Sequence, residues 1–330
     1  MSEHDPSPIR RRVTRRGLLR SAVAGGVATG GLATSVTAQG NGNGDGTSKG
    51  FPPDGITEYG DAVDLGEGRV RPFTTETPSG EPKYHGVEFD RSALEGLPSA
   101  AELDEDEGTY DDKYGPNGEA LEVHRKQSLE FFVPFPDAAE TPFTFLGLNW
   151  NPDGHPGGKG AWLVPHFDVH FHMLDTGTVD AIEGPALPPY DDPEATGEIP
   201  AERIPDGYVR SPEPVADERY ITDMGEHTAP RDAPELPDGP DDDGNPDRFT
   251  ATLIQGFVGV GASDADPRLA FVEPMLTREY LRDLDGTDVF DVPQPEVYPH
   301  DERHPRTYAI RDVPSAETVC VVLQEFEPVD

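Results

Sequence analysis

The segment Pro165–Met173 places side chains of metal-binding type at alternate positions. In a β-strand successive side chains point to opposite faces, so a strand here puts His166, Asp168, His170 and His172 on one face. The positions between them hold Phe, Val, Phe and Met, which form a hydrophobic face. Imidazole and carboxylate groups are common ligands of transition metals. The pattern therefore predicts a strand with a metal site on one face and the protein core behind the other.

The spacing within this strand favours one pair of ligands. His170 and His172 lie two residues apart on the same face and form the natural chelating pair. His166 lies about 13 Å along a strand from His170, so it joins the same ion only if the strand bends or bulges. The donor types suit zinc, iron, manganese or copper and do not select among them. The alternative is a polar strand face over solvent, which three histidines and an aspartate within an otherwise apolar strand make the weaker reading.

Three residues elsewhere in the chain are candidates to complete the site. His155 lies in a Pro-Asp-Gly turn just before the histidine strand, and His227 follows Met-Gly-Glu. Glu273 is the only acid of an apolar segment, where an unpaired buried carboxylate is costly. For each of the three, a turn or a satisfied core polar group is the competing interpretation. His300 and His304, in a polar proline-rich stretch, are expected to be surface residues.

The rest of the chain predicts a mainly β fold, a sandwich or barrel with a few short helices and long acidic loops. Alternating or continuous apolar runs between turn residues predict the following strands: Arg69–Thr75, Tyr84–Phe89, Leu129–Pro134, Phe143–Trp150, Trp162–Leu174, Phe249–Val260, Leu269–Glu273 and Thr318–Phe326. Short helices are expected around 92–96, at 201–204 and at 277–284, the last with Thr277 as its N-cap. Two acidic, proline-rich stretches, Tyr190–Asp217 and Thr228–Asp247, are expected to be solvated loops.

The chain is expected to contain an export signal and one domain. Residues 1–38 combine a basic region holding Arg15 and Arg16 with a small-residue, weakly apolar stretch, which is typical of a twin-arginine signal peptide. Residues 39–60 are rich in Gly, Asn and Asp and predict a flexible linker, and residues 61–330 predict a single β-rich domain. We therefore expect an extracellular or cell-surface protein without stable membrane insertion.

The composition indicates habitat more than mechanism. The formal net charge is −38, with 26 basic and 64 acidic residues, and the scarcity of lysine among the basic residues is typical of proteins from high-salt hosts. Such a charge excludes an extended basic surface of the kind that binds nucleic acid. The single cysteine, Cys320, lies in an apolar run and allows no intramolecular disulfide.

Several motifs together resemble a family of exported bacterial and archaeal proteins with a conserved domain of unknown function. The better-known bacterial relative is under sigma-E/anti-sigma-E control, the extracytoplasmic stress response, and some members carry dioxygenase-like names. The motifs that carry the resemblance are Asn149-Trp150-Asn151-Pro152-x-Gly154-His155, Pro165-His166-Phe167-Asp168-x-His170-Phe171, Met224-Gly225-x-His227 and Phe271-x-Glu273-Pro274-Met275-Leu276-Thr277. The resemblance implies an exported β-domain protein that forms ring-like homo-oligomers.

The resemblance also changes the order of the candidate ligands. It favours His166, Asp168, His170, His227 and Glu273, whereas such proteins often carry an aromatic residue where this chain has His172. The spacing argument and the resemblance therefore disagree over His172 and agree on His170.

Two functions remain open at this point. The first is a secreted metalloprotein with a small-molecule ligand at an open coordination position, where oxygen-dependent or hydrolytic chemistry is the expected class. The second is a non-enzymatic envelope or stress protein in which the His/Asp row is a structural polar network within a homo-oligomer. No nucleophile elbow, phosphate loop or dinucleotide fingerprint is present in the sequence.

Overall fold

The computed structural model describes residues 50–105, 128–137, 140–155, 157–179, 182, 199–210, 220–221, 224–238, 242–259 and 267–329. All of them belong to one compact unit, Lys49–Asp330. The expected signal peptide, the first part of the expected linker and most of the acidic stretch Tyr190–Asp217 lie outside the described residues. Among the helices described, none has the length and apolar character needed to cross a membrane.

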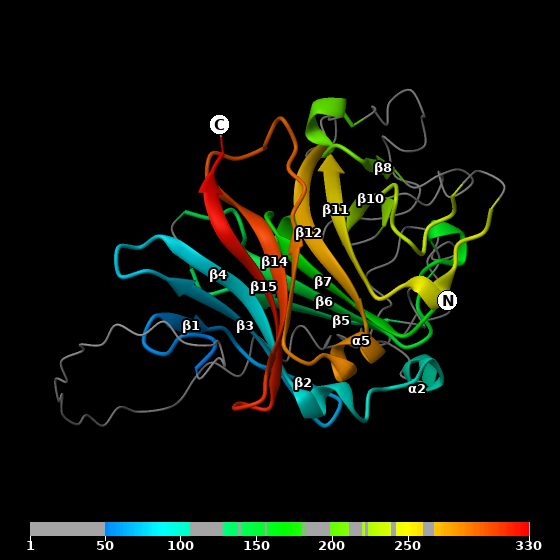
Figure 1. Ribbon diagram of the computed structural model, residues 1–330, viewed down its shortest axis with the longest axis horizontal. Coiled ribbons are helices and arrows are strands. Elements are labelled where there is room, and N and C mark those ends of the chain that lie inside the picture. Colours follow the sequence, from blue (N-terminus) through cyan, green and yellow to red (C-terminus); the bar gives the residue numbers. More distant parts are fainter. Residues whose placement is uncertain are drawn as a thin grey trace, which may run out of the picture. The chain divides into compact units, whose positions relative to one another are not determined.

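The described strands form two antiparallel sheets (Figure 1). The first sheet has the order β1-β3-β4-β15-β14-β13, with β2 paired to β3. Its strands are β1 (Thr57–Tyr59), β2 (Val63–Leu65), β3 (Gly68–Glu76), β4 (Pro82–Asp90), β13 (Thr287–Asp291), β14 (Arg303–Val313) and β15 (Thr318–Pro328).

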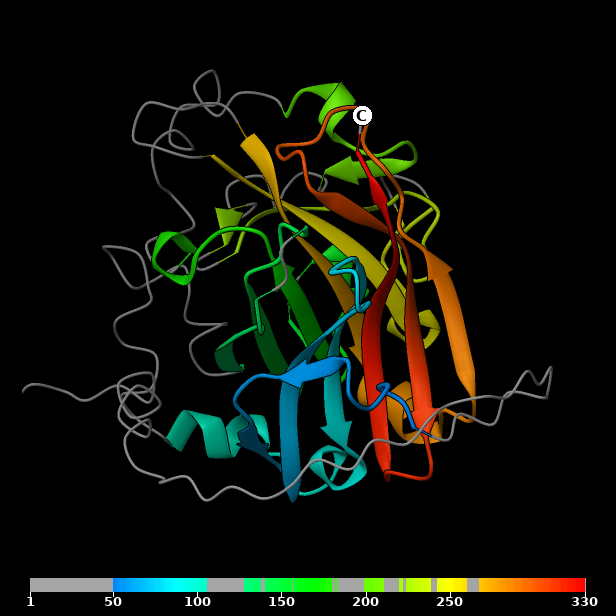
Figure 2. The same ribbon diagram turned by 90° about the vertical axis from the view of Figure 1, so that its left-hand side faces the viewer.

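The second sheet carries the histidine strand. Its order is β5-β6-β7-β12-β11-β10-β8, with β9 paired to β10. Its strands are β5 (Leu129–Pro134), β6 (Phe145–Asn151), β7 (His166–His172), β8 (Tyr208–Arg210), β9 (Tyr220–Ile221), β10 (Gly225–Pro230), β11 (Ala251–Gly259) and β12 (Pro267–Thr277). The two sheets face one another without closing into a barrel (Figures 1 and 2), which confirms the mainly β fold and makes it a sandwich.

The main core fills the space between the sheets. Phe167, Val169 and Phe171 of β7 are fully buried there, in one apolar cluster with residues of the first sheet such as Phe89 and Val321. The Phe89 and Phe167 rings meet edge to face with their centroids 5.5 Å apart. The predicted hydrophobic face of the 166–172 strand is therefore confirmed.

The opposite face of the second sheet is also covered. A second apolar cluster combines Phe271 and Met275 of β12 with Trp162, Val179 and Phe249, which come from the connections that cross this face. The polar face of β7 is consequently enclosed between its sheet and these connections, and its four polar side chains are each no more than 3% exposed. The alternative of surface histidines over solvent is excluded for this strand.

Helices are few and short among the described residues. They are α2 (Ala100–Glu105), α4 (Thr176–Val179) and α5 (Arg278–Asp283), with single 3-10 turns at η1 (Arg91–Leu94), η2 (Gly158–Gly160), η3 (Ala201–Arg203) and η5 (Pro246–Arg248). The Thr277 hydroxyl accepts a hydrogen bond from the Tyr280 amide, so the predicted N-cap of α5 is confirmed.

Two expectations about loops and linkers need correction. The stretch from Thr228 to Asp247 is not merely a solvated loop, because its start belongs to β10 and Glu235 is completely buried. Within the expected linker, Phe51 packs on the Phe73 ring and β1 pairs with β3. Packed structure thus begins about ten residues before the expected domain boundary at 61.

Candidate metal centre

The register of the second sheet gathers residues that are far apart in the sequence. β12 pairs with β7 so that Val272 lies opposite Phe171 and Met275 opposite Asp168, a register that sets Glu273 opposite His170. His227 of β10 lies two strands beyond β12 in this sheet. Directly opposite residues on one face have Cβ atoms only about 5 Å apart, so side chains from neighbouring strands meet readily.

His170, His227 and Glu273 form one compact group, called here the first group. Their ligand atoms lie within 4.8 Å of one another. The Nε2 atoms of His170 and His227 lie 3.4 Å from the two different carboxylate oxygens of Glu273. His170 Nε2 and Glu273 Oε2 are buried and have no hydrogen-bond partner in the described part of the chain. Two imidazole nitrogens and one carboxylate thus converge on one point.

A hydrogen bond sets the orientation of His170. Its Nδ1 lies 3.3 Å from the Gly147 carbonyl oxygen, and only a protonated Nδ1 can donate to that oxygen. The neutral ring then presents the Nε2 lone pair to Glu273. Histidine ligands of metals usually have this arrangement, with the second nitrogen donating to a carbonyl or a carboxylate.

Burial changes the protonation of all three residues in the first group. It lowers the pKa of His170 to about 4 and that of His227 to about 3, so both imidazoles are neutral near pH 7. Burial, with a smaller contribution from the charge of Asp168, raises the pKa of Glu273 well above its usual value. An ionised Glu273 is therefore disfavoured until a positive charge lies beside it.

The aromatic ring of Phe271 packs against both histidines of the first group. Phe271 packs edge to face on His170 and on His227, with centroid distances of 4.8 and 5.3 Å. The ring lies over Gly256 of β11, where an added Cβ would come within 1.9 Å of it. A glycine at 256 is thus required for Phe271 to occupy this place between the two histidines.

His155, His166 and Asp168 form a second group beside the first. Their ligand atoms also lie within 4.8 Å of one another. Asp168 Oδ1 lies 3.1 Å from His166 Nε2, and Asp168 Oδ2 lies 3.5 Å from His155 Nε2. Burial raises the pKa of Asp168, but the two neighbouring histidines outweigh it and hold the pKa well below its usual value. In contrast to Glu273, Asp168 is ionised without a metal.

His172 joins neither group. Its ring stacks on Phe145 at 4.3 Å and on His170 at 5.4 Å, with interplanar angles of 13° and 12°. Burial, together with the charges of His170 and His227, lowers its pKa well below the usual value. His172 therefore occupies the position of a neutral stacked ring beside the first group.

Of the six candidate ligands named from the sequence, the structure brings together His170, His227 and Glu273 in one place and His166 and Asp168 in another. His155, expected only as a turn residue or an additional ligand, completes the second set. The separation of His166 from His170 follows the rise of a straight strand.

The expectation for His300 and His304 is wrong. His304 is completely buried in β14, and its ring packs against Tyr298, His300 and Phe143. The His300 side chain is only 8% exposed. Pro305 and several arginines mask the strand pattern here, which is why the sequence indicated a loop. Both residues belong to the first sheet or its connections and lie outside the two groups.

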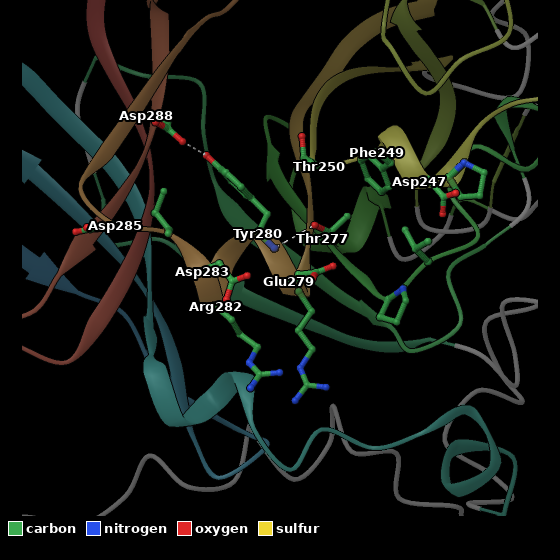
Figure 3. A pocket seen from close by; sticks show the side chains of 15 residues that line it. Asp247, Phe249, Thr250, Thr277, Glu279, Tyr280, Arg282, Asp283, Asp285 and Asp288 are labelled. Atoms are coloured by element: carbon green, nitrogen blue, oxygen red, sulfur yellow. Dashed lines mark hydrogen bonds between the residues drawn. The ribbon is translucent and has the colours of Figure 1, made fainter.

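A cavity of about 830 Å³ lies at the start of α5 (Figure 3). Val164, Phe249 and Thr277 line it, and each of these also lies next to His166. Both arginines of the lining are engaged by Glu95, and Tyr280 donates a hydrogen bond to Asp288. No ligand atom of either group lines this cavity.

Comparison with known proteins gives no relative. No family model, no curated protein and no solved structure matches the chain. The family resemblance stated above therefore stays a prediction, and the functional argument rests on the geometry of the two groups.

Proposed function

We propose that the protein is an exported metalloprotein that holds a transition-metal ion with His170, His227 and Glu273. One observation carries the proposal. Glu273, only 1% exposed, faces the Nε2 atoms of both histidines at 3.4 Å, and no described residue donates a hydrogen bond to its Oε2. A buried carboxylate left in this way is costly unless a cation neutralises it.

The electrostatics of the group supports a divalent cation. Without one, burial keeps both imidazoles neutral and favours the protonated carboxyl group of Glu273. A bound dication favours the ionised carboxylate and uses the neutral imidazoles as they are. Metal binding is then expected to release the proton of Glu273.

The donor set supports a reactive site more than a closed structural one. Two histidines and one carboxylate fill three positions, whereas structural zinc sites are closed by four protein ligands. Such a set with open positions occurs in non-haem iron oxygenases and in zinc hydrolases. The His227 side chain keeps 12% of its surface exposed, so the first group is not completely closed off from solvent. We infer oxygen-dependent or hydrolytic chemistry on a small molecule, with zinc, iron, manganese or copper as the ion.

Export and assembly belong to the same proposal. The twin-arginine signal pattern supports export of the already folded, metal-loaded chain, and the resemblance to exported stress-regulated proteins supports a homo-oligomer. Replacing Arg15 and Arg16 by lysine should retain the protein inside the cell, as measured by cell fractionation. Unchanged export of the lysine variant would contradict the twin-arginine route.

Metal analysis tests the central claim. Untagged protein purified in high salt should contain transition metal, and removal of the metal should lower the melting temperature. Glu273→Gln should lose one equivalent of bound metal. The matched control is Glu235→Gln, because Glu235 is also a fully buried carboxylate but binds the Thr252 hydroxyl outside both groups. If the protein is metal-free and added zinc, manganese, iron or copper does not change its melting temperature, the proposal is refuted. The alternative, in which the His/Asp row is a structural polar network, is then favoured.

A further inference from the structure

We infer that the second group, His155, His166 and Asp168, binds its own transition-metal ion, independently of the ion proposed for the first group. The inference goes beyond a single metal centre, because it makes this face of the sheet a two-ion surface. It rests on the positions of buried polar atoms in the second group alone.

The hydrogen bond of His166 fixes which of its nitrogens is free. Nδ1 lies 2.7 Å from the Val164 carbonyl oxygen, so Nδ1 must carry the proton that it donates. In the neutral ring Nε2 then has only a lone pair, and it points towards Asp168 Oδ1 at 3.1 Å. Apart from each other, Nε2 and Oδ1 have no hydrogen-bond partner among the described residues. Two buried acceptors that face each other in this way need either a metal ion or a proton between them.

The rest of the group is arranged as the surroundings of a metal usually are. Asp168 Oδ2 accepts a hydrogen bond of 2.8 Å from Asn151 Nδ2, which holds the plane of the carboxylate. The carbonyl of Val164 does the same for the imidazole of His166. Asn151 belongs to β6 and Val164 lies just before β7, so groups next to the ligands in the chain or in the sheet hold both ligands in orientation.

The third ligand comes from the turn after β6. Gly154 has φ of +73°, and a Cβ there would lie 2.1 Å from the Trp162 carbonyl oxygen, so this turn requires glycine. The turn lets the His155 amide donate to the same carbonyl at 3.3 Å and brings the His155 ring within 4.7 Å of the His166 ring. The His155 side chain is 13% exposed, which gives an ion a route from solvent.

The two ions would be separate centres. Asp168 and His170 are successive residues on one face of β7, about 7 Å apart at the usual rise. The two ions of a co-catalytic metal pair lie about 3.5–4 Å apart and share a bridging ligand. No described residue belongs to both groups, so neither ion depends on a shared ligand. The donor set of two imidazoles and one carboxylate again suits zinc, iron, manganese or copper.

The competing explanation is a proton in place of the metal. If His166 were protonated on both nitrogens, the group would be an Asp–His ion pair that needs no ion. The two cases differ in metal stoichiometry, so a titration separates them.

The test is a titration of the metal-stripped, untagged mature protein with Co²⁺ in high salt, followed by visible absorption and calorimetry. The wild type should bind two equivalents. Asp168→Asn and His155→Gln should each bind one, and Glu273→Gln should bind the other one. His300→Gln, a histidine of similar exposure outside both groups, should still bind two. Circular dichroism melting curves verify that each variant is folded, and His155, at the edge of the group, is the change least able to unfold the chain.

Each outcome separates the two proposals. If the wild type binds one equivalent of Co²⁺, and this is lost in Glu273→Gln but kept in Asp168→Asn and His155→Gln, the second site is refuted and the first is supported. One equivalent that is lost in His155→Gln and kept in Glu273→Gln supports the second site and refutes the first. Binding of no Co²⁺ overturns both.

A residue that supports Asp168 without touching the ion gives an independent readout. Asn151→Ala should weaken binding at the second group by about 10–100-fold and leave the first group unchanged. Asn149→Ala is the matched control, because Asn149 lies on the same strand and the same face but donates to Ser128. Equal affinities in Asn151→Ala and Asn149→Ala would contradict the assignment.

Discussion

The acid sensitivity of the fold is predicted from His85, a histidine outside both metal groups. His85 lies in β4, is completely buried, and its ring nitrogens contact the hydroxyls of Thr74 at 3.2 Å and Thr141 at 2.6 Å. Burial lowers the pKa of His85 from 6.5 to about 3. Because the unfolded chain takes up a proton at the higher pKa, His85 favours unfolding as the pH falls. Its contribution to stability is intact above pH 6.5 and is lost between pH 6.5 and about 3.

The size of this effect follows from the two pKa values. Each pH unit below 6.5 shifts the unfolding equilibrium by about 1.4 kcal/mol for one such group. Between pH 7 and pH 5 the protein should therefore lose about 2 kcal/mol through His85 alone. In His85→Gln the glutamine amide can still hydrogen-bond to the two threonines, but it does not take up a proton in this pH range. The wild type should thus lose about 2 kcal/mol more than His85→Gln over this pH range.

Urea unfolding at pH 7 and pH 5, followed by circular dichroism in constant high salt, measures the difference. The many carboxylates titrate in both proteins and cancel in the comparison. Phe135→Leu is the control, because the Phe135 ring packs on His85 at 5.3 Å and its loss weakens packing without removing a titrating group. It should be destabilised equally at both pH values. If the wild type and His85→Gln lose stability in parallel, His85 is not held neutral in the folded protein and the reasoning is refuted.

Three further predictions concern the second sheet: two substitutions and one pH dependence. Gly256→Ala should destabilise the fold by about 1–3 kcal/mol and weaken metal binding at the first group, because the new methyl group displaces the Phe271 ring; urea unfolding and Co²⁺ titration measure the two effects. Arg210→Ala should lower the free energy of unfolding, measured with urea, by about 3 kcal/mol, because it leaves Glu226, which is 1% exposed, as an unpaired buried carboxylate. Replacing both Arg210 and Glu226 by Leu should restore part of this free energy. Between pH 6.5 and 5 burial keeps both imidazoles of the first group neutral, so metal binding displaces at most one proton. The Co²⁺ affinity of this group should therefore fall by at most about tenfold per pH unit in a competition titration. A hundredfold fall per pH unit would show that two histidine protons are displaced instead.

Local patterns in the sequence were sufficient for the strand that carries the site. The alternation in Pro165–Met173 predicts both faces of β7, and the single acid of an apolar run marks Glu273 as a residue that needs a partner. Both features depend on the two-residue period of a strand, which a short stretch of sequence contains completely. The N-cap at Thr277 is equally local.

What the sequence could not supply is the pairing between distant strands. Nothing within β7 indicates that β12 lies beside it, or that β10 brings His227 to the same place. The role of Gly256 is likewise invisible in the sequence, because it depends on the Phe271 ring of the neighbouring strand. β14 was missed for a different reason: Pro305 and the half-buried arginines break its apolar alternation although His304 is buried.

In the structure His170 and His172 are not arranged as a chelating pair. The lone pairs of an imidazole lie in the plane of the ring, and these two rings are stacked at 12° with their centroids 5.4 Å apart. Their lone pairs therefore point along nearly parallel planes and do not meet at one ion. Across the sheet the situation is reversed, because Glu273 on the neighbouring strand faces His170 directly, and its second oxygen reaches His227. In this sheet the candidate metal centre is therefore formed by residues of different strands and not by two histidines along one strand. The second group does have two ligands on β7, His166 and Asp168. One of them is a carboxylate, whose two oxygens can face different partners, so no second imidazole of the same strand is needed.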